Sequence, residues 1–151
     1  ASVRSGAYQR ILQELDPDVA VTARACPLFV PLVENGRFRP GDPVIETVAR
    51  EYLEPLKAEG IDTLIMGCTH YPLLEEVVAQ VMGPGVTLVD SGAQAARQLK
   101  DSLTAHDALC SERPGGITLY ASDITGDFGA LAPQFLREPA PQVLEVDIDK
   151  Y

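Results

Sequence analysis

Basic residues are scarce in this chain. Its 151 residues include 12 Lys and Arg against 22 Asp and Glu, which gives a net charge of −10. This balance argues against a protein that binds the phosphate backbone of a nucleic acid, because such proteins cluster Lys and Arg on one face. We therefore expect no nucleic-acid partner. An anionic substrate is still compatible with the sequence if local backbone N–H groups at helix starts hold it.

Long apolar runs are absent as well. No stretch of about 18 apolar residues is present, so we expect no membrane span. No charged-then-apolar leader is visible, and the three cysteines are an odd number. Both features favour reduced thiols in the cytoplasm over a disulfide framework. With only two histidines and no zinc-type cysteine spacing, the sequence predicts no metal site.

What the sequence does contain is an alternation of strand and helix patterns. Apolar strands are expected at 61–66 and 86–90, and a β-rich run occupies 19–25. Helices are expected at 2–15, 43–59, 71–82 and 92–103. A further strand is expected at 117–122, and residues 26–36 read as a loop with two prolines. This order predicts an α/β fold with a mostly parallel sheet and helices on both faces.

The sequence "LIMGCTHYPLLEE" combines a thiol and an imidazole at the end of a strand. Cys68 and His70 follow the expected strand at 61–66 directly. In open α/β sheets, ligands bind beyond the carboxyl ends of the strands. Gly67 permits a close approach to the backbone, and a following helix start would favour a thiolate. The alternative is that Cys68 is a small buried residue and His70 a packing residue.

Three segments in register carry a resemblance to a known family. "GCTHYPLL" at 67–74 resembles the second cysteine motif of glutamate racemase. "ACPLFVPLVENG" at 25–36 resembles that family's Cys-Pro-x-Phe-Val-Pro-Leu-Val-Glu segment, and "SVRSGAY" at 2–8 resembles the end of its Gly-Thr-x-Ala-Thr-x-x-Ser-x-x-Tyr segment. The resemblance covers about residues 1–105 strongly and the remainder more weakly.

The resemblance implies a cofactor-independent isomerase that interconverts L- and D-glutamate through two cysteines. Cys68 is implied to be one acid/base, with His70 as its proton-transfer partner. Thr69 is implied to bind the substrate, as are Ser2, which replaces a usual Thr, and Glu34, whose alternative is a solvated loop carboxylate. The resemblance further implies a cytoplasmic enzyme that supplies D-glutamate for peptidoglycan synthesis, and a homodimer is compatible with it.

The family's other cysteine segment, Cys-Asn-Thr, does not occur in this sequence, and its chains are nearly twice as long. The chain begins without Met inside a helix-like stretch, so we expect it to be a carboxy-terminal portion. Residues 1–90 would form the second lobe. Residues 91–151 would cross back towards the first lobe, whose main part is absent. The resemblance therefore predicts that the chain alone is inactive.

Three other interpretations remain open. An aspartate racemase of the same superfamily would also pair two cysteines. A non-catalytic carboxylate-binding domain would bind glutamate without proton exchange. Finally, Cys68 could act as a nucleophile with His70 as its base, although the sequence offers no oxyanion-hole motif for that chemistry.

Overall fold

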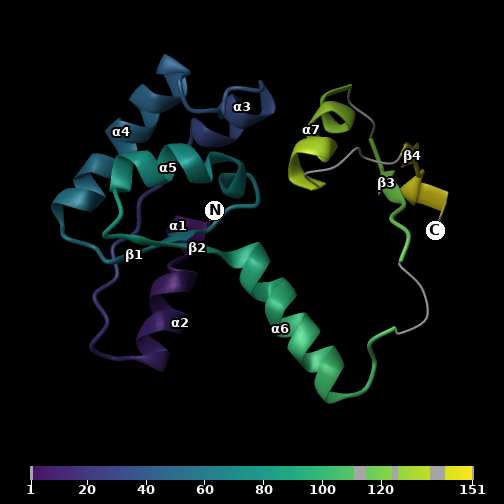
Figure 1. Cartoon of the computed structure of the whole chain (residues 1–151), viewed down its shortest axis with the longest axis horizontal. Coiled ribbons are helices and arrows are strands. Elements are labelled where there is room, and N and C mark those ends of the chain that lie inside the picture. Colours follow the sequence, from purple (N-terminus) through teal and green to yellow (C-terminus); the bar gives the residue numbers. More distant parts are fainter. Residues whose placement is uncertain (1, 111–114, 124–125, 137–141, 151) are drawn as a thin grey trace. The chain divides into compact units, whose positions relative to one another are not determined.

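The computed structural model describes residues 2–110, 115–123, 126–136 and 142–150. The chain divides into two compact units, Ala1–Ala95 (unit 1) and Ala96–Tyr151 (unit 2). Figure 1 shows the order of the elements along the chain. Each unit contains one pair of parallel strands. The predicted α/β class with parallel strand pairing is therefore confirmed.

Unit 1 is built on two short strands, β1 (Thr63–Met66) and β2 (Thr87–Asp90). They pair in parallel, and the register begins with Thr63 opposite Thr87. Helices α4 and α5 lie on one side of this pair, and α2 lies on the other (Figure 1). Apolar parallel strands require cover on both faces, so this layering agrees with the apolar sequences of both strands.

Helix α4 (Pro43–Ala58) begins where the sequence predicts. The Asp42 side chain accepts a hydrogen bond from the Val44 N–H at 2.9 Å, and Pro43 occupies the first helical position, which needs no N–H donor. After the helix ends, Gly60 adopts a positive φ of 74°, a conformation that costs a glycine little.

The helix expected at 2–15 is two helices, α1 (Ser2–Ser5) and α2 (Ala7–Leu15). Gly6 separates them with a φ of 62°, which an α-helix does not accommodate. No residue of α2 is buried among the described residues, although its sequence carries an apolar face. The two-helix arrangement corrects the prediction of one continuous helix.

The segment expected to be a loop at 26–36 contains helix α3 (Phe29–Glu34). Its prolines suggested a loop, but Pro31 lies in the first helical turn, where backbone N–H groups have no intrahelical acceptor. Phe29 and Val33 anchor the helix with side chains that are 2% and 0% exposed. Burial of this apolar pair therefore outweighs the loop-like composition.

The β-rich run at 19–25 forms no strand in the structure. Its half-buried valines, Val19 and Val21, alternate with exposed Ala20 and Thr22, as in a strand with one covered face. A strand, however, needs a neighbour to accept its backbone hydrogen bonds. The composition at 19–25 thus matches a strand whose partner is not provided by the described residues.

The core of unit 1 lies between α3, α4, the 3₁₀ turn η1 (Tyr71–Leu74) and α5 (Glu75–Met82). The helix expected at 71–82 is therefore a 3₁₀ turn followed by an α-helix. The most deeply buried large side chains come from these four elements: Phe29, Val33, Ile45, Leu74 and Val77.

Unit 2 begins at Ala96, within helix α6 (Ser91–Ala105). The Asp90 carboxylate accepts hydrogen bonds from the first N–H groups of this helix, so Asp90 caps it, and the expected cap Ser91 is already helical. Unit 2 further contains β3 (Leu119–Ala121), α7 (Gly126–Leu136), β4 (Val143–Glu145) and the 3₁₀ turn η2 (Ile148–Lys150). Among the described helices, none combines the length and apolarity needed to cross a membrane.

Candidate active site

The cysteine motif lies in a tight connection between β1 and η1. The Gly67 N–H donates to the Ile65 carbonyl at 3.0 Å, and the Tyr71 N–H donates to the Cys68 carbonyl at 3.1 Å. Cys68 is half-buried between these two turns. Because α5 begins only at Glu75, a 3₁₀ turn, rather than the expected α-helix start, follows the thiol. The turn geometry, not a helix terminus, is what holds Cys68 at the strand end.

Tyr71 ties this connection to the core. Its ring packs edge-on against Phe29 at a centroid distance of 5.4 Å, and its hydroxyl donates to the Cys26 carbonyl at 3.4 Å. Burial, together with the charge that the nearby Cys26 and Cys68 would carry as thiolates, raises the pKa of Tyr71 to about 12. Tyr71 therefore stays a neutral donor at neutral pH and fixes the residues just after Cys68.

His70 has a polar neighbour at each ring nitrogen. Its Nε2 lies 3.2 Å from Oε1 of Glu34, the last residue of α3. Its Nδ1 lies 3.4 Å from the Thr69 hydroxyl. A neutral ring that donates from Nε2 to Glu34 can accept from Thr69 at Nδ1, so the two contacts are compatible with a single tautomer. Glu34 and Thr69 thereby restrict the orientation of the imidazole.

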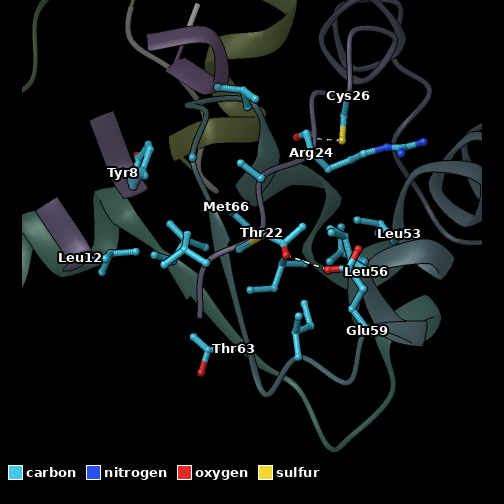
Figure 2. A pocket seen from close by; sticks show the side chains of 18 of the residues that line it. Tyr8, Leu12, Thr22, Arg24, Cys26, Leu53, Leu56, Glu59, Thr63 and Met66 are labelled. Carbon is cyan, nitrogen blue, oxygen red and sulfur yellow. Dashed lines mark hydrogen bonds between the residues drawn. The ribbon is translucent and has the colours of Figure 1, made fainter. Parts of the chain in front are cut away.

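A pocket of about 920 Å³ opens beside β1 and reaches Cys68. Figure 2 shows Tyr8 and Leu12 of α2 on one side of it and Leu53 and Leu56 of α4 on the other. Its wall also includes Cys26 and Tyr71, but not Thr69, His70 or Glu34. Cys68 thus connects two environments, an apolar pocket and the polar group formed by Thr69, His70 and Glu34.

The two cysteines at this pocket differ in burial. Cys26 is buried, and its burial raises its pKa to about 11 despite the opposing charge of Arg24. A thiol with such a pKa is protonated at neutral pH and is a poor base. Cys68 is only half-buried. Cys68 is therefore the better candidate of the two for proton transfer.

Four of the five predicted site residues lie together in unit 1. Cys68, Thr69 and His70 follow β1, and Glu34 reaches them from α3 by contacting His70. Ser2 belongs to α1, but its side chain lies outside the described residues. Within the described ranges, no three His, Cys, Asp or Glu side chains gather as a metal site would require.

Two tyrosines support the motif and were missing from the sequence-based site. An added Cβ at Gly67 would lie 3.2 Å from the Tyr8 ring, so this ring lies directly on the glycine before Cys68. Tyr71 anchors the other end of the motif, as described above. The available signal was the Tyr-Pro pair inside "GCTHYPLL", whereas no local pattern links Tyr8 to Gly67, which lie far apart in the sequence.

No family model matches this chain. It is 38% identical to the glutamate racemase of Latilactobacillus sakei over 149 residues, which cover 99% of this chain and 54% of that protein. The glutamate racemase of Corynebacterium diphtheriae is 42% identical, with 97% of this chain and 53% of that protein covered.

Solved structures agree with these relatives. Glutamate racemase from Francisella tularensis, crystallised with D-glutamate, matches all of this chain and 56% of its own, with a TM-score of 0.88 and 30% identity. The Thermus thermophilus glutamate racemase, crystallised with β-chloro-D-alanine, matches with a TM-score of 0.81 and 38% identity, and the chain covers 55% of it. By sequence and by fold, this chain is similar to the glutamate racemases, and it spans about half the length of those it matches.

Proposed function

We propose that this chain carries one half of the active site of a cofactor-independent glutamate racemase and corresponds to its carboxy-terminal portion. The observation that carries the proposal is the position of Cys68. This thiol stands at the carboxyl end of a parallel strand, next to a histidine that a carboxylate orients, in a chain matched over almost its whole length by glutamate racemases.

Racemisation needs a base on one face of the α-carbon and an acid on the other. In this proposal the Cys68 thiolate removes the α-proton of one enantiomer, and a second thiol from the rest of the polypeptide delivers a proton to the opposite face. Each turnover takes one proton from the substrate and returns one, and it leaves Cys68 protonated and the second thiol as a thiolate, which is the state that the reverse reaction requires. Because the α-proton is weakly acidic, fixed donors must stabilise the developing charge on the substrate carboxylate.

The neighbouring residues supply those supporting roles. Thr69 is exposed and offers a hydroxyl and a backbone N–H to the substrate carboxylate. His70, held by Glu34, acts as the proton-transfer partner of Cys68. Glu34, which contacts His70, would also bind the substrate in this scheme, and Ser2 retains a hydroxyl for substrate binding. The reaction needs no metal and no cofactor in this scheme.

The proposal extends to the rest of the molecule. Residues 1–90 form the second lobe of the racemase, and residues 91–151 return to the first lobe. The complete enzyme acts on free glutamate in the cytoplasm and supplies D-glutamate for peptidoglycan, and it is compatible with a homodimer. On its own, the chain offers one acid/base and is expected to be inactive.

A chimeric enzyme tests the proposal. In it, this chain replaces the matched portion of the Latilactobacillus sakei glutamate racemase, with which it shares 38% identity. The chimera is incubated with L-glutamate in heavy water, and both D-glutamate formation and deuterium at the α-carbon are measured. We expect both products. The same assay with aspartate distinguishes an aspartate-specific relative, which would process aspartate faster.

Two cysteine variants test whether Cys68 takes part in the proton transfer. Cys68→Ser should reduce racemisation by about a thousandfold or more, the scale expected for a lost acid/base, whereas Cys110→Ser, at an exposed thiol of unit 2, should leave it unchanged. A folded chimera that binds D-glutamate and exchanges no α-proton would identify a carboxylate-binding domain instead. Equal activity of the Cys68→Ser variant would rule out the proposed role of this thiol.

A further inference from the structure

Two consecutive residues of the cysteine motif contact the two ends of helix α3. His70 reaches its last residue, since its Nε2 lies 3.2 Å from Oε1 of Glu34. Tyr71 reaches its beginning, where its ring packs edge-on against Phe29 at a centroid distance of 5.4 Å. A helix of six residues is about 9 Å long. The contacts of two adjacent motif residues therefore span the whole of α3.

Tyr71 also holds the turn that carries the thiol. Its backbone N–H donates to the Cys68 carbonyl at 3.1 Å, and Thr69 and His70 lie inside this turn. The Tyr71 ring is thus attached to one end of the turn and packs against α3 with its edge. A displacement of the ring would move the imidazole and the thiol together relative to Glu34.

The ring contributes more to this contact than the hydroxyl does. The hydroxyl donates to the Cys26 carbonyl at 3.4 Å, which is long for an O–H···O hydrogen bond. That carbonyl already accepts the Phe29 N–H at 3.2 Å. In contrast, the ring packs against a phenylalanine that is 2% exposed, in an edge-on arrangement that aromatic pairs favour. The Tyr71→Phe substitution would keep this packing.

A second tyrosine offers a matched comparison. Tyr52 of α4 packs edge-on against the same Phe29 ring, also at 5.4 Å, and is 8% exposed. It belongs to α4 and not to the cysteine motif. Loss of the Tyr52 ring should therefore weaken the core while Tyr71 still holds α3 against the motif.

We propose that Tyr71 is a positioning residue for the racemase reaction, whose ring holds α3 against the cysteine motif so that Glu34 orients His70 beside Cys68. The proposal rests on the proposed function for the roles of His70 and Cys68, whereas the alignment itself is a property of this chain. Tyr71 takes no part in the proton path. Loss of its ring would move Glu34 away from Nε2 and leave Cys68 beside an imidazole of mixed orientation.

Nitrogen NMR of the neutral His70 ring tests the alignment in the full chain of 151 residues. His106 is the other histidine, and a His106→Gln variant assigns the two sets of signals. Tyr71→Leu removes the ring and keeps apolar volume. We expect it to raise the share of the Nδ1–H form, as loss of the Glu34 acceptor would. Tyr71→Met, whose unbranched side chain fills irregular gaps, repeats the measurement if Tyr71→Leu does not fold.

Two further variants separate positioning from general destabilisation. Tyr71→Phe and Tyr52→Leu should both keep the original tautomer ratio, although Tyr52→Leu should lower the urea midpoint. An unchanged ratio in Tyr71→Leu would overturn the proposal. An equal change in Tyr52→Leu would overturn it as well, because loosening of the core would then explain the effect. An equal change in Tyr71→Phe would contradict the role of the ring.

Activity of the chimeric racemase described above tests the consequence for the reaction. We expect Tyr71→Leu to lower kcat/KM by about tenfold to a hundredfold, the scale of a small misplacement of a reacting group, and the other two variants to stay within about threefold. Full activity of Tyr71→Leu would overturn the proposal. An inactive unsubstituted chimera would count against the proposed function instead. The tautomer ratios need no activity, so the two failures give different results.

Discussion

The two units of this chain differ in how much of their apolar surface they bury. Unit 1 holds every buried apolar residue of the described ranges except Ala132. In unit 2, the described side chains of Leu99, Ile117 and Tyr120 are more than half exposed, at 60%, 51% and 61%. Burial of apolar surface is the main favourable term in folding. Unit 1 therefore contains its own stabilising core, and unit 2 depends on packing that its described residues do not provide.

This difference also concerns the site. The candidate catalytic residues lie in the unit with the core, and Leu74, a fully buried residue, ends the motif that contains them. Unit 1 can thus hold Cys68 and His70 in place by packing of its own residues.

Truncation of one leucine in each unit should show the largest difference between the units in the free energy of unfolding. Leu74→Ala removes a side chain that is 0% exposed, and Leu99→Ala removes one that is 60% exposed. We expect Leu74→Ala to lower the free energy of unfolding by about 2–5 kcal/mol, because it leaves a cavity, and Leu99→Ala to change it by less than about 0.5 kcal/mol. Urea unfolding followed by circular dichroism measures both. Equal effects would show that the units do not differ as described.

Alkaline pH should destabilise unit 1 through its buried acids. Burial raises the pKa of Cys26 from 9.0 to about 11, so the folded chain holds this proton more tightly than the unfolded chain does. Stability from this thiol is complete below pH 9 and is lost as the pH rises towards 11. We expect the urea midpoint to fall over that range, less steeply in Cys26→Ala. Cys110→Ala, at an exposed thiol, serves as the control and should keep the original slope.

Gly67→Ala probes the contact between α2 and the strand end. The added Cβ would lie 3.2 Å from the Tyr8 ring, so the ring must shift, at a cost of about 1 kcal/mol. In a Tyr8→Ala background the same substitution should cost much less. A double-mutant cycle by urea unfolding measures the coupling. Additive effects of the two substitutions would mean that α2 is not docked on the cysteine motif.

Glu34→Ala should have the smallest effect on stability, because the carboxylate is about half exposed. Its effect on His70 is more specific. Without the acceptor at Nε2, the ring loses the contact that favours its Nε2–H tautomer, and nitrogen NMR of the imidazole should show a larger share of the Nδ1–H form. Glu54→Ala, an exposed control on α4, should leave the ring unchanged. An unchanged imidazole in Glu34→Ala as well would show that Glu34 does not orient His70.

Sequence reasoning succeeded where local chemistry determines the structure. Asp42, Pro43 and Gly60 mark the limits of α4, and the apolar runs predicted β1 and β2. It failed at α3, where the prolines indicated a loop. Two buried side chains stabilise that helix, and their tertiary contacts are not visible in the local pattern.

The 19–25 run failed for a different reason. Its composition favours a strand, but strand formation depends on a neighbour, and no described segment supplies one. The site shows the same division. The position of Cys68 after a strand followed from the pattern, whereas the contacts of Glu34 with His70 and of Tyr8 with Gly67 depend on packing between distant segments.

We expect that unit 1 folds stably by itself around the cysteine motif, and that unit 2 needs further packing contacts to become stable. Hydrogen exchange of the isolated chain tests it most directly. We predict strong protection in α4, α5 and the β1–β2 pair, and exchange near the rates of an unfolded chain in α6 beyond Ala95 and in β3, α7 and β4. Comparable protection in both units of a monomeric sample would contradict the claim.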